Sequence, residues 1–128
     1  MIGQRKARRP MSTNEQAVDL VHLNRYTGGD RALNEEILSL FERQCHEMLE
    51  RLDVFASDSG EDKHWREITH TLKGAARGIG AFALAEAAAD AEKTGLADRQ
   101  ALIVAVQRIK EKSASVHLFI EQFLKSDG

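Results

Sequence analysis

The chain has 128 residues, enough for one domain with a modest core. Hydrophobic residues make up 42% and charged residues 30%, which is typical of an ordinary globular domain. The formal net charge of −2 indicates no general affinity for nucleic acid, and no apolar run is long enough to span a bilayer. We therefore expect neither a nucleic-acid nor a membrane partner. Cys45 is the only cysteine, which favours a reducing compartment, the cytoplasm.

The first ten residues form a basic segment that ends at Pro10. Its cations are Arg5, Lys6, Arg8 and Arg9. A short charged run of this kind, with no aromatic residue between the cations, is typical of a solvated tail. We predict a disordered tail over residues 1–11 and a single domain over 12–126.

Helix signals follow Pro10 along the rest of the chain. Ser12 with Glu15 three residues later is typical of a capping box and predicts a short helix over about 13–23. Asp30 can cap a long second helix that runs to about Ala56. Apolar residues keep helical spacing along that segment: Leu33, Ile37, Leu40, Phe41, Cys45, Met48, Leu49, Leu52 and Phe55.

Three further helices are expected after the turn at 57–60. The first covers about 61–79, and Gly78 and Gly80 bracket its end and can supply a left-handed cap. An alanine-rich helix follows over about 82–93 and ends near Gly95, and a last long helix begins after Asp98 and reaches about Lys125.

No segment has a credible strand pattern, and the connections between the expected helices are short. Short connections favour antiparallel neighbours. The predicted fold is therefore all-α, an antiparallel up-and-down four-helix bundle with a short additional N-terminal helix covering one end.

His70 lies on the face of the 61–79 helix that is opposite its apolar stripe. The stripe consists of Trp65, Ile68, Leu72, Ala75, Ala76 and Ile79. Within about 60° of His70 around the helix lie Arg66, Glu67, Lys73, Gly74 and Arg77. Nearby cations suit a histidine that carries a negatively charged group. The exposure of the ring, and the missing side chain at Gly74, suit a histidine that a large partner must reach.

The run His70-Thr71-Leu72-Lys73-Gly74, closed by Ile79-Gly80-Ala81, resembles the signature of the histidine-containing phosphotransfer (HPt) domain family. The segment 23–30 and the helix plan are also similar, and the resemblance covers about residues 14–125. It implies a four-helix bundle that relays a phosphoryl group between receiver-domain aspartates through a phosphohistidine in two-component signalling. It also implies a phosphocarrier without ATP-dependent kinase activity of its own.

The resemblance implies roles for individual residues. His70 would be the phosphorylated residue, Lys73 would help to hold the phosphoryl oxygens, and Gly74 would leave room for the receiver's loops. Arg77 and Arg66 are candidates for phosphoryl or docking contacts. The implied partners are response-regulator receiver domains and an upstream hybrid histidine kinase, with Mg²⁺ carried by the receiver and no cofactor on this chain. We expect a monomer.

One position departs from the pattern of the family. Some members place a polar side chain, often Gln, on the following helix against the active His. The segment 82–93 contains no Gln, so the candidates for that contact are Glu86, Asp90 and Glu92.

Three alternative functions stay open on the sequence alone. The His-Thr-Leu-Lys-Gly run also resembles the phospho-accepting domain of chemotaxis kinases. Glu67-x-x-His70 and Glu61-x-x-His64 match the ligand spacing of metal-binding di-iron bundles, although both pairs fall on one helix and His70 is expected to face outward. The third alternative is an adaptor bundle in which the histidine is incidental.

Overall fold

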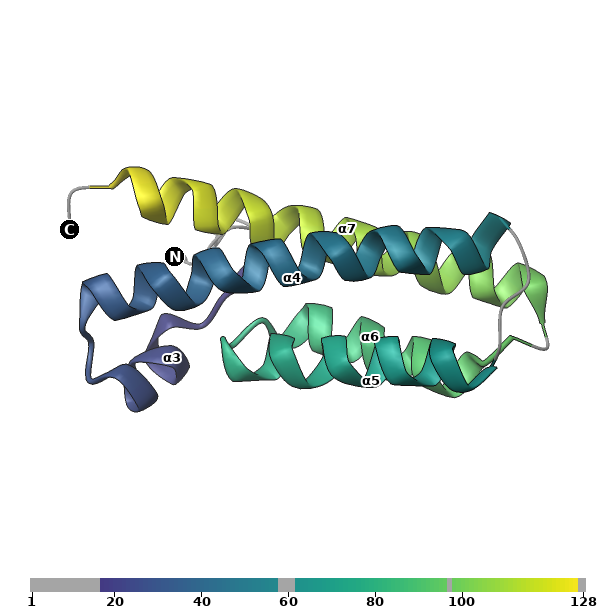
Figure 1. Ribbon diagram of the computed structural model, residues 1–128. Coiled ribbons are helices and arrows are strands. Elements are labelled where there is room, and N and C mark those ends of the chain that lie inside the picture. The colour runs from purple at the N-terminus through teal and green to yellow at the C-terminus, as the bar shows by residue number, and fades with distance from the viewer. Residues whose placement is uncertain (1–16, 58–61, 97, 127–128) are drawn as a thin grey trace, which may run out of the picture.

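The protein is described by a computed structural model that covers residues 17–57, 62–96 and 98–126 (Figure 1). Within these residues the chain is helical and has no strand, so the predicted all-α fold is confirmed. Its helices are α3 (Leu20–Thr27), α4 (Arg31–Ser57), α5 (Asp62–Gly78), α6 (Phe82–Thr94) and α7 (Arg99–Lys125). The predicted tail and the Ser12–Glu15 capping box lie outside the described residues.

The four longer helices pack around a common core. α4 contacts α5 and α7, and α6 contacts the same two helices. Consecutive helices run in opposite directions, and α3 lies at the end of the bundle where α4 begins (Figure 1). None of the helices in the described part of the chain combines the length and the apolarity that crossing a bilayer requires.

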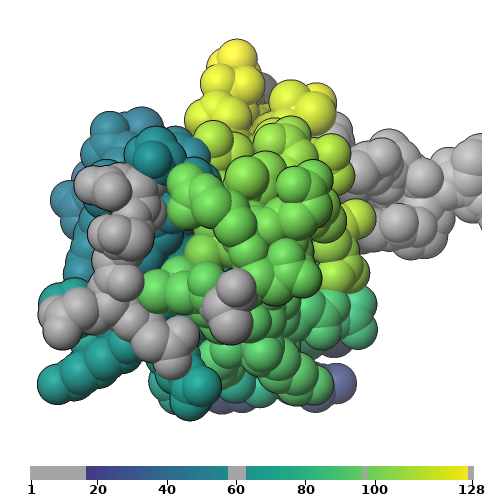
Figure 2. All heavy atoms as spheres, turned by 90° about the vertical axis from the view of Figure 1, so that its right-hand side faces the viewer, coloured from purple at the N-terminus to yellow at the C-terminus, as the bar shows by residue number. Residues whose placement is uncertain are grey.

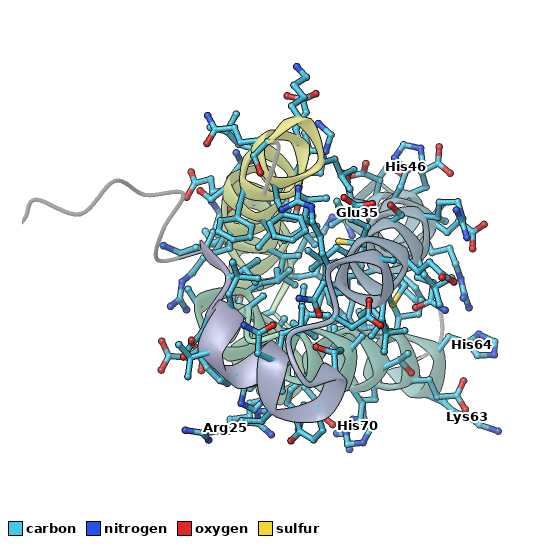
Figure 3. All side chains as sticks on the ribbon, turned by 90° about the vertical axis from the view of Figure 1, so that its left-hand side faces the viewer. Arg25, Glu35, His46, Lys63, His64 and His70 are labelled. Carbon is cyan, nitrogen blue, oxygen red and sulfur yellow. The ribbon has the colours of Figure 1, made fainter. Side chains whose placement is uncertain are left out.

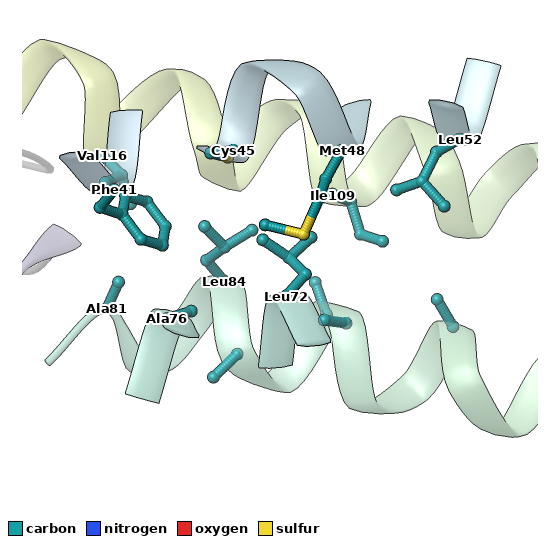
Figure 4. Packing of buried hydrophobic residues seen from close by; sticks show 14 of the residues in the cluster. Phe41, Cys45, Met48, Leu52, Leu72, Ala76, Ala81, Leu84, Ile109 and Val116 are labelled. Atoms are coloured by element: carbon teal, nitrogen blue, oxygen red, sulfur yellow. The ribbon is translucent and has the colours of Figure 1, made fainter. Parts of the chain in front are cut away.

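The core lies between these helices, where large side chains from α4 meet smaller ones from α6. Met48 of α4 points toward Leu72 of α5 and Leu84 of α6, and Phe41 of α4 lies opposite Ala76 and Ala81 (Figure 4). Four alanines of α6 are buried: Ala85, Ala87, Ala88 and Ala91. Small side chains let helices approach closely, so α6 can pack tightly against both α5 and α7.

The helix expected over about 13–23 is interrupted in the part that the structure describes. Ala17 is helical, Val18 and Asp19 are not, and α3 then runs from Leu20 to Thr27. Residues 13–16 lie outside the described residues. Asp19 has an extended backbone and its carboxylate accepts a hydrogen bond from the His22 N–H, which makes it the N-cap. The helix ends at Gly28, whose φ of 68° is left-handed.

Other predicted caps are present. Asp30 accepts a hydrogen bond from the Leu33 N–H, and Asp98 accepts one from the Ala101 N–H, so each satisfies an N–H at the start of a long helix. Figure 2 views the end of the bundle away from α3, where α4 ends and α7 begins. There the Arg99 guanidinium donates to the main-chain oxygens of Phe55 and Ala56 at the end of α4. This contact joins the end of α4 to the start of α7.

The turn between α5 and α6 requires a glycine at Gly80. Its N–H donates to the Arg77 oxygen at 3.1 Å, and the Ala81 N–H donates to the Ala76 oxygen at 2.8 Å, which is the Schellman pattern with Gly80 at a φ of 82°. A Cβ at Gly80 would lie 2.6 Å from the Asp19 oxygen. The Asp19 N–H also donates to the Gly80 oxygen at 2.9 Å, so this turn holds the start of α3.

Candidate functional site

The imidazole of His70 points away from the bundle. Its side chain is 67% exposed, whereas Leu72 and Ala76 on the inner face of α5 are fully buried. Figure 3 shows the ring directed outward on the same side of the molecule as Arg25 of α3. This orientation agrees with the helical spacing of the sequence and makes the ring accessible to another protein.

A carboxylate from α6 holds the inner nitrogen of this ring. The Nδ1 atom of His70 lies 3.1 Å from Oε2 of Glu92. The other oxygen of the same carboxylate, Oε1, accepts a hydrogen bond from Nζ of Lys73 at 2.8 Å. Glu92 therefore joins the two α5 residues that the sequence singled out, one turn apart.

The electrostatics of the cluster favour an ionised Glu92. The Lys73 ammonium, which donates a hydrogen bond to it, lowers the pKa of the Glu92 carboxyl below its usual 4.5. Burial acts in the opposite direction, and His70 lowers the pKa further. An ionised carboxylate can only accept hydrogen bonds, so Nδ1 of His70 carries the proton in this contact. In the neutral ring, the exposed Nε2 then has a free lone pair.

The two other acidic candidates on α6 have a different partner. Asp90 accepts a hydrogen bond from Nη1 of Arg108 at 2.6 Å, and Glu86 lies 3.9 Å from Nη2 of the same guanidinium. These contacts join α6 to α7 on the side away from α5. Of the three candidates left open by the sequence, Glu92 is the one that contacts His70.

A buried hydrogen bond sets the position of Glu92. The indole N–H of Trp65, which is fully buried in α5, donates to the main-chain oxygen of Ala91 at 2.9 Å. Ala91 precedes Glu92 directly, so this bond fixes the register of α6 against α5 beside the site. A lone tryptophan in an apolar stripe predicts core packing, but the sequence carries no signal for the partner of its N–H.

The remaining predicted site residues lie on the exposed surface of α5. Gly74 is one turn beyond His70, and a Cβ placed there would meet nothing within 4 Å. Arg66 and Arg77 are exposed about one turn before and two turns after His70. The structure therefore brings His70 and Lys73 together through Glu92, with Gly74 and the two arginines around them.

The surface position of these residues bears on the metal-site alternative. Glu67 and His70 are both exposed, whereas a di-iron bundle has its ligands inside. Among the described residues, no group of three or more His, Cys, Asp or Glu side chains is arranged to hold a metal ion. Glu61, from the second such pair, lies outside the described residues.

Comparison with known proteins identifies a family. The model of the Hpt domain matches residues 36–122, which is more than half of the chain and includes α5, α6 and most of α4 and α7. No curated protein and no solved structure gives a match. The matched segment contains His70 together with Lys73 and Glu92. The chain therefore belongs to the Hpt domain family.

Proposed function

We propose that this chain is a phosphocarrier of a two-component phosphorelay, in which His70 accepts a phosphoryl group from one receiver-domain aspartate and passes it to another. The observation that carries the proposal is the exposed His70 ring held by Glu92 beside Lys73, in a chain of the Hpt domain family. In this proposal α4 to α7 form an antiparallel up-and-down four-helix bundle, α3 covers one end, and the chain has no ATP-dependent kinase activity.

The nucleophile in this reaction is Nε2 of His70. Because Glu92 accepts from Nδ1, the lone pair of Nε2 points into solvent, toward an approaching aspartyl phosphate. As the N–P bond forms, the P–O bond to the aspartate breaks and the carboxylate leaves with the electron pair. The ring becomes a cation that keeps its Nδ1 proton, and the Glu92 carboxylate stabilises this charge. The reverse reaction returns the phosphoryl group to a second receiver.

Lys73 supplies positive charge for the phosphoryl oxygens. Its ammonium has three donors, of which the contact with Glu92 uses one. The remaining donors can therefore bind the phosphoryl group while Glu92 holds the side chain in place. Arg77 and Arg66 add positive charge to the same face of α5, where they can contact the phosphoryl group or an acidic partner.

The rest of the chemistry belongs to the partner. Phosphoryl transfer needs Mg²⁺ and an aspartate nucleophile, and we propose that the receiver domain supplies both. The upstream partner would be a hybrid histidine kinase. A transient exchange of this kind needs only a modest interface and suits a monomer in the cytoplasm.

A transfer assay tests the proposal. Purified receiver domains, labelled with ³²P on the aspartate, are mixed with the chain, and the label is followed by gel electrophoresis. We expect at least one receiver to label the chain through an acid-labile linkage. The His70→Gln variant should accept no label, while its circular dichroism spectrum should show the same helix content as the wild type. The matched control is His46→Gln, which changes an exposed histidine on a different helix, α4, and should accept label normally. Labelling of the His70→Gln variant would contradict the proposal.

A further inference from the structure

A groove lies between α4 and α7 on a side of the molecule away from His70. It has a volume of about 450 Å³. Its floor is apolar and consists of Phe41, Cys45, Leu49, Ala114 and Val116. Figure 3 shows His46, which lines this groove, near the top of the view and His70 at the bottom. We call it the α4–α7 groove, and it is separate from the candidate site.

Two ion pairs join α4 to α7 along the α4–α7 groove. In one, Nδ1 of His117 lies 3.0 Å from Oε1 of Glu42. In the other, Nζ of Lys110 lies 2.6 Å from Oδ1 of Asp53. Glu42 and Asp53 are eleven residues apart, which is about 16 Å along α4 at the usual rise of 1.5 Å per residue. The apolar floor is therefore bounded by a pair of charged contacts of known separation.

The rim of the groove carries more negative than positive charge. Its lining includes the carboxylates of Glu42, Glu50 and Asp53 but only one ammonium, that of Lys110. Glu50 is 70% exposed, and its contact with His46 on the same helix is long, at 3.6 Å. A carboxylate has about four acceptor positions, so even the two carboxylates in ion pairs can accept further hydrogen bonds. The groove thus suits an occupant that combines cations with apolar side chains.

The chain itself contains a segment of this chemistry. Residues 5–9 are Arg-Lys-Ala-Arg-Arg, with Ile2 before them and Met11 after them. Residues 1–10 carry a formal charge of +4 and the whole chain −2, so residues 11–128 carry −6. The segment 5–9 lies outside the described residues. Five extended residues span about 16 Å, which equals the separation of the two ion pairs along α4.

The segment 5–9 is close enough along the chain to reach the groove. Ala17 is in the core, and the Asp19 N–H bonds to Gly80 in the turn before Ala81. Ala81 lies opposite Phe41, which lines the groove (Figure 4). The path half-way around one helix of 10–12 Å diameter is about 17 Å. Residue 9 is eight residues before Ala17, and eight extended residues span about 27 Å.

We propose that the α4–α7 groove binds the basic segment 5–9 of the same chain, with its cations on the carboxylates of Glu42, Glu50 and Asp53. A tether this short gives an effective concentration in the millimolar range, so a weak interaction is enough to fill the groove. The α5 face repels the segment, because Arg66, Lys73 and Arg77 give that face positive charge. This inference concerns a different surface from His70 and does not rest on the proposed function.

The experiment places a nitroxide spin label beside the basic segment of the full chain. Gln4→Cys provides the attachment site, and the buried thiol of Cys45 stays unlabelled in the native protein. The nitroxide broadens the amide NMR signals of residues that it approaches, and the same sample with reduced nitroxide is the reference. Glu50→Lys reverses one charge on the rim, and Ala114→Leu fills the groove from an exposed position. Glu47→Lys, at an exposed α4 position outside the groove lining, is the matched control.

We expect the amides of Glu50, Lys110 and Ala114 to lose more than half of their intensity, while those of Gly74 and Arg77 keep theirs. Glu50→Lys and Ala114→Leu should each restore most of the lost intensity, and Glu47→Lys should not. Salt at 1 M, where the Debye length is about 3 Å, should restore it as well.

Three results would overturn the proposal. The first is an equal loss on all faces of the bundle, and the second is a loss at the groove that neither groove variant reduces. The third is a loss that arises when a ¹⁵N-labelled chain without nitroxide is mixed with an unlabelled chain that carries it, because the occupant would then be the segment of a second copy. Restoration by Glu47→Lys to the same extent as by Glu50→Lys would also contradict the groove as the binding site.

Discussion

The carboxylate of Glu92 lies between the side chains of His70 and Lys73, 3.1 Å from Nδ1 of the ring and 2.8 Å from the ammonium. Its two oxygens serve the two residues separately, so one side chain orients the ring and holds the cation. Because Glu92 belongs to α6 and its two partners to α5, this geometry depends on how the two helices pack. The Trp65 hydrogen bond to Ala91 stabilises that packing next to the site.

Replacing Glu92 tests its role as a positioning residue. Glu92→Ala removes the acceptor for Nδ1, so both ring tautomers become available and Lys73 loses its anchor. We expect labelling by phosphoramidate to slow about tenfold, the lower end of the effect of removing such an orienting contact. Glu92→Gln keeps a carbonyl acceptor and should be slowed less. Equal rates in the wild type and Glu92→Ala would show that the ring does not need this contact.

The lowered pKa of Glu92 also predicts how stability depends on pH. The carboxyl is more acidic in the folded chain than its usual 4.5, so its contacts stabilise the fold above pH 4.5. This contribution is lost as the pH falls below 4.5 and through the folded-state pKa. The free energy of unfolding, measured with urea, should therefore fall less for Glu92→Gln than for the wild type between pH 5 and pH 3. A steeper fall in the variant would contradict the predicted sign.

Removing the ammonium of Lys73 should slow transfer without abolishing it. Lys73→Ala leaves the nucleophile intact and removes a charged donor to the phosphoryl oxygens, for which we expect a loss of about tenfold in the transfer rate. Lys73→Arg keeps the charge and should lose less. Rapid-quench measurements with a labelled receiver give these rates. If Lys73→Ala transfers as fast as the wild type, Lys73 has no part in holding the phosphoryl group.

Gly74→Ala should stabilise the fold and weaken transfer at the same time. The new methyl group meets no atom within 4 Å, and alanine is favoured over glycine in a helix by about 1 kcal/mol. Urea unfolding should therefore show a gain of up to about 1 kcal/mol. Transfer from a receiver should slow because the methyl group occupies the approach to His70. Gln107→Ala, at an exposed site of α7, is the control and should leave transfer unchanged.

The buried thiol of Cys45 should be unreactive in the folded protein. Burial, with a smaller contribution from Glu42, raises the pKa of Cys45 from 9.0 to about 11. At pH 8 a disulfide reagent should therefore modify Cys45 of the native protein no faster than the chain unfolds. The same reagent should modify Cys45 rapidly in denaturant. Because the unfolded thiol ionises first, the fold should lose stability as the pH rises above 9. Immediate reaction of the native protein would contradict this burial.

Much of the fold follows from local sequence signals. The observed helix ends at Asp30, Gly95 and Asp98 agree with the predicted ones, because a helix cap depends on only a few neighbouring residues. The outward position of His70 follows from the period of the α5 stripe in the same way. The sequence did not predict the break at Val18 and Asp19, because Asp19 caps α3 and bonds to Gly80, a contact between residues 61 positions apart that a local pattern does not contain.

The details of the site depend on tertiary packing. Glu86, Asp90 and Glu92 all have the right chemistry, and only the register of α6 decides that Glu92 meets His70 while the other two meet Arg108. Leu40 keeps the helical spacing of the buried α4 residues, yet it is 46% exposed because it lies beside an open groove that Tyr26 of α3 and Gly78 of α5 also line. Neither the contact of Glu92 with His70 nor the exposure of Leu40 can be predicted from residue spacing along one helix.

The most direct test of the central claim is the ³¹P–¹⁵N coupling in the NMR spectrum of the ¹⁵N-labelled chain after it has been phosphorylated by a receiver. We predict a single phosphoryl group bonded to Nε2 of His70, with Nδ1 still protonated against Glu92. A phosphoryl group on any other residue, or on Nδ1 of His70, would contradict the account.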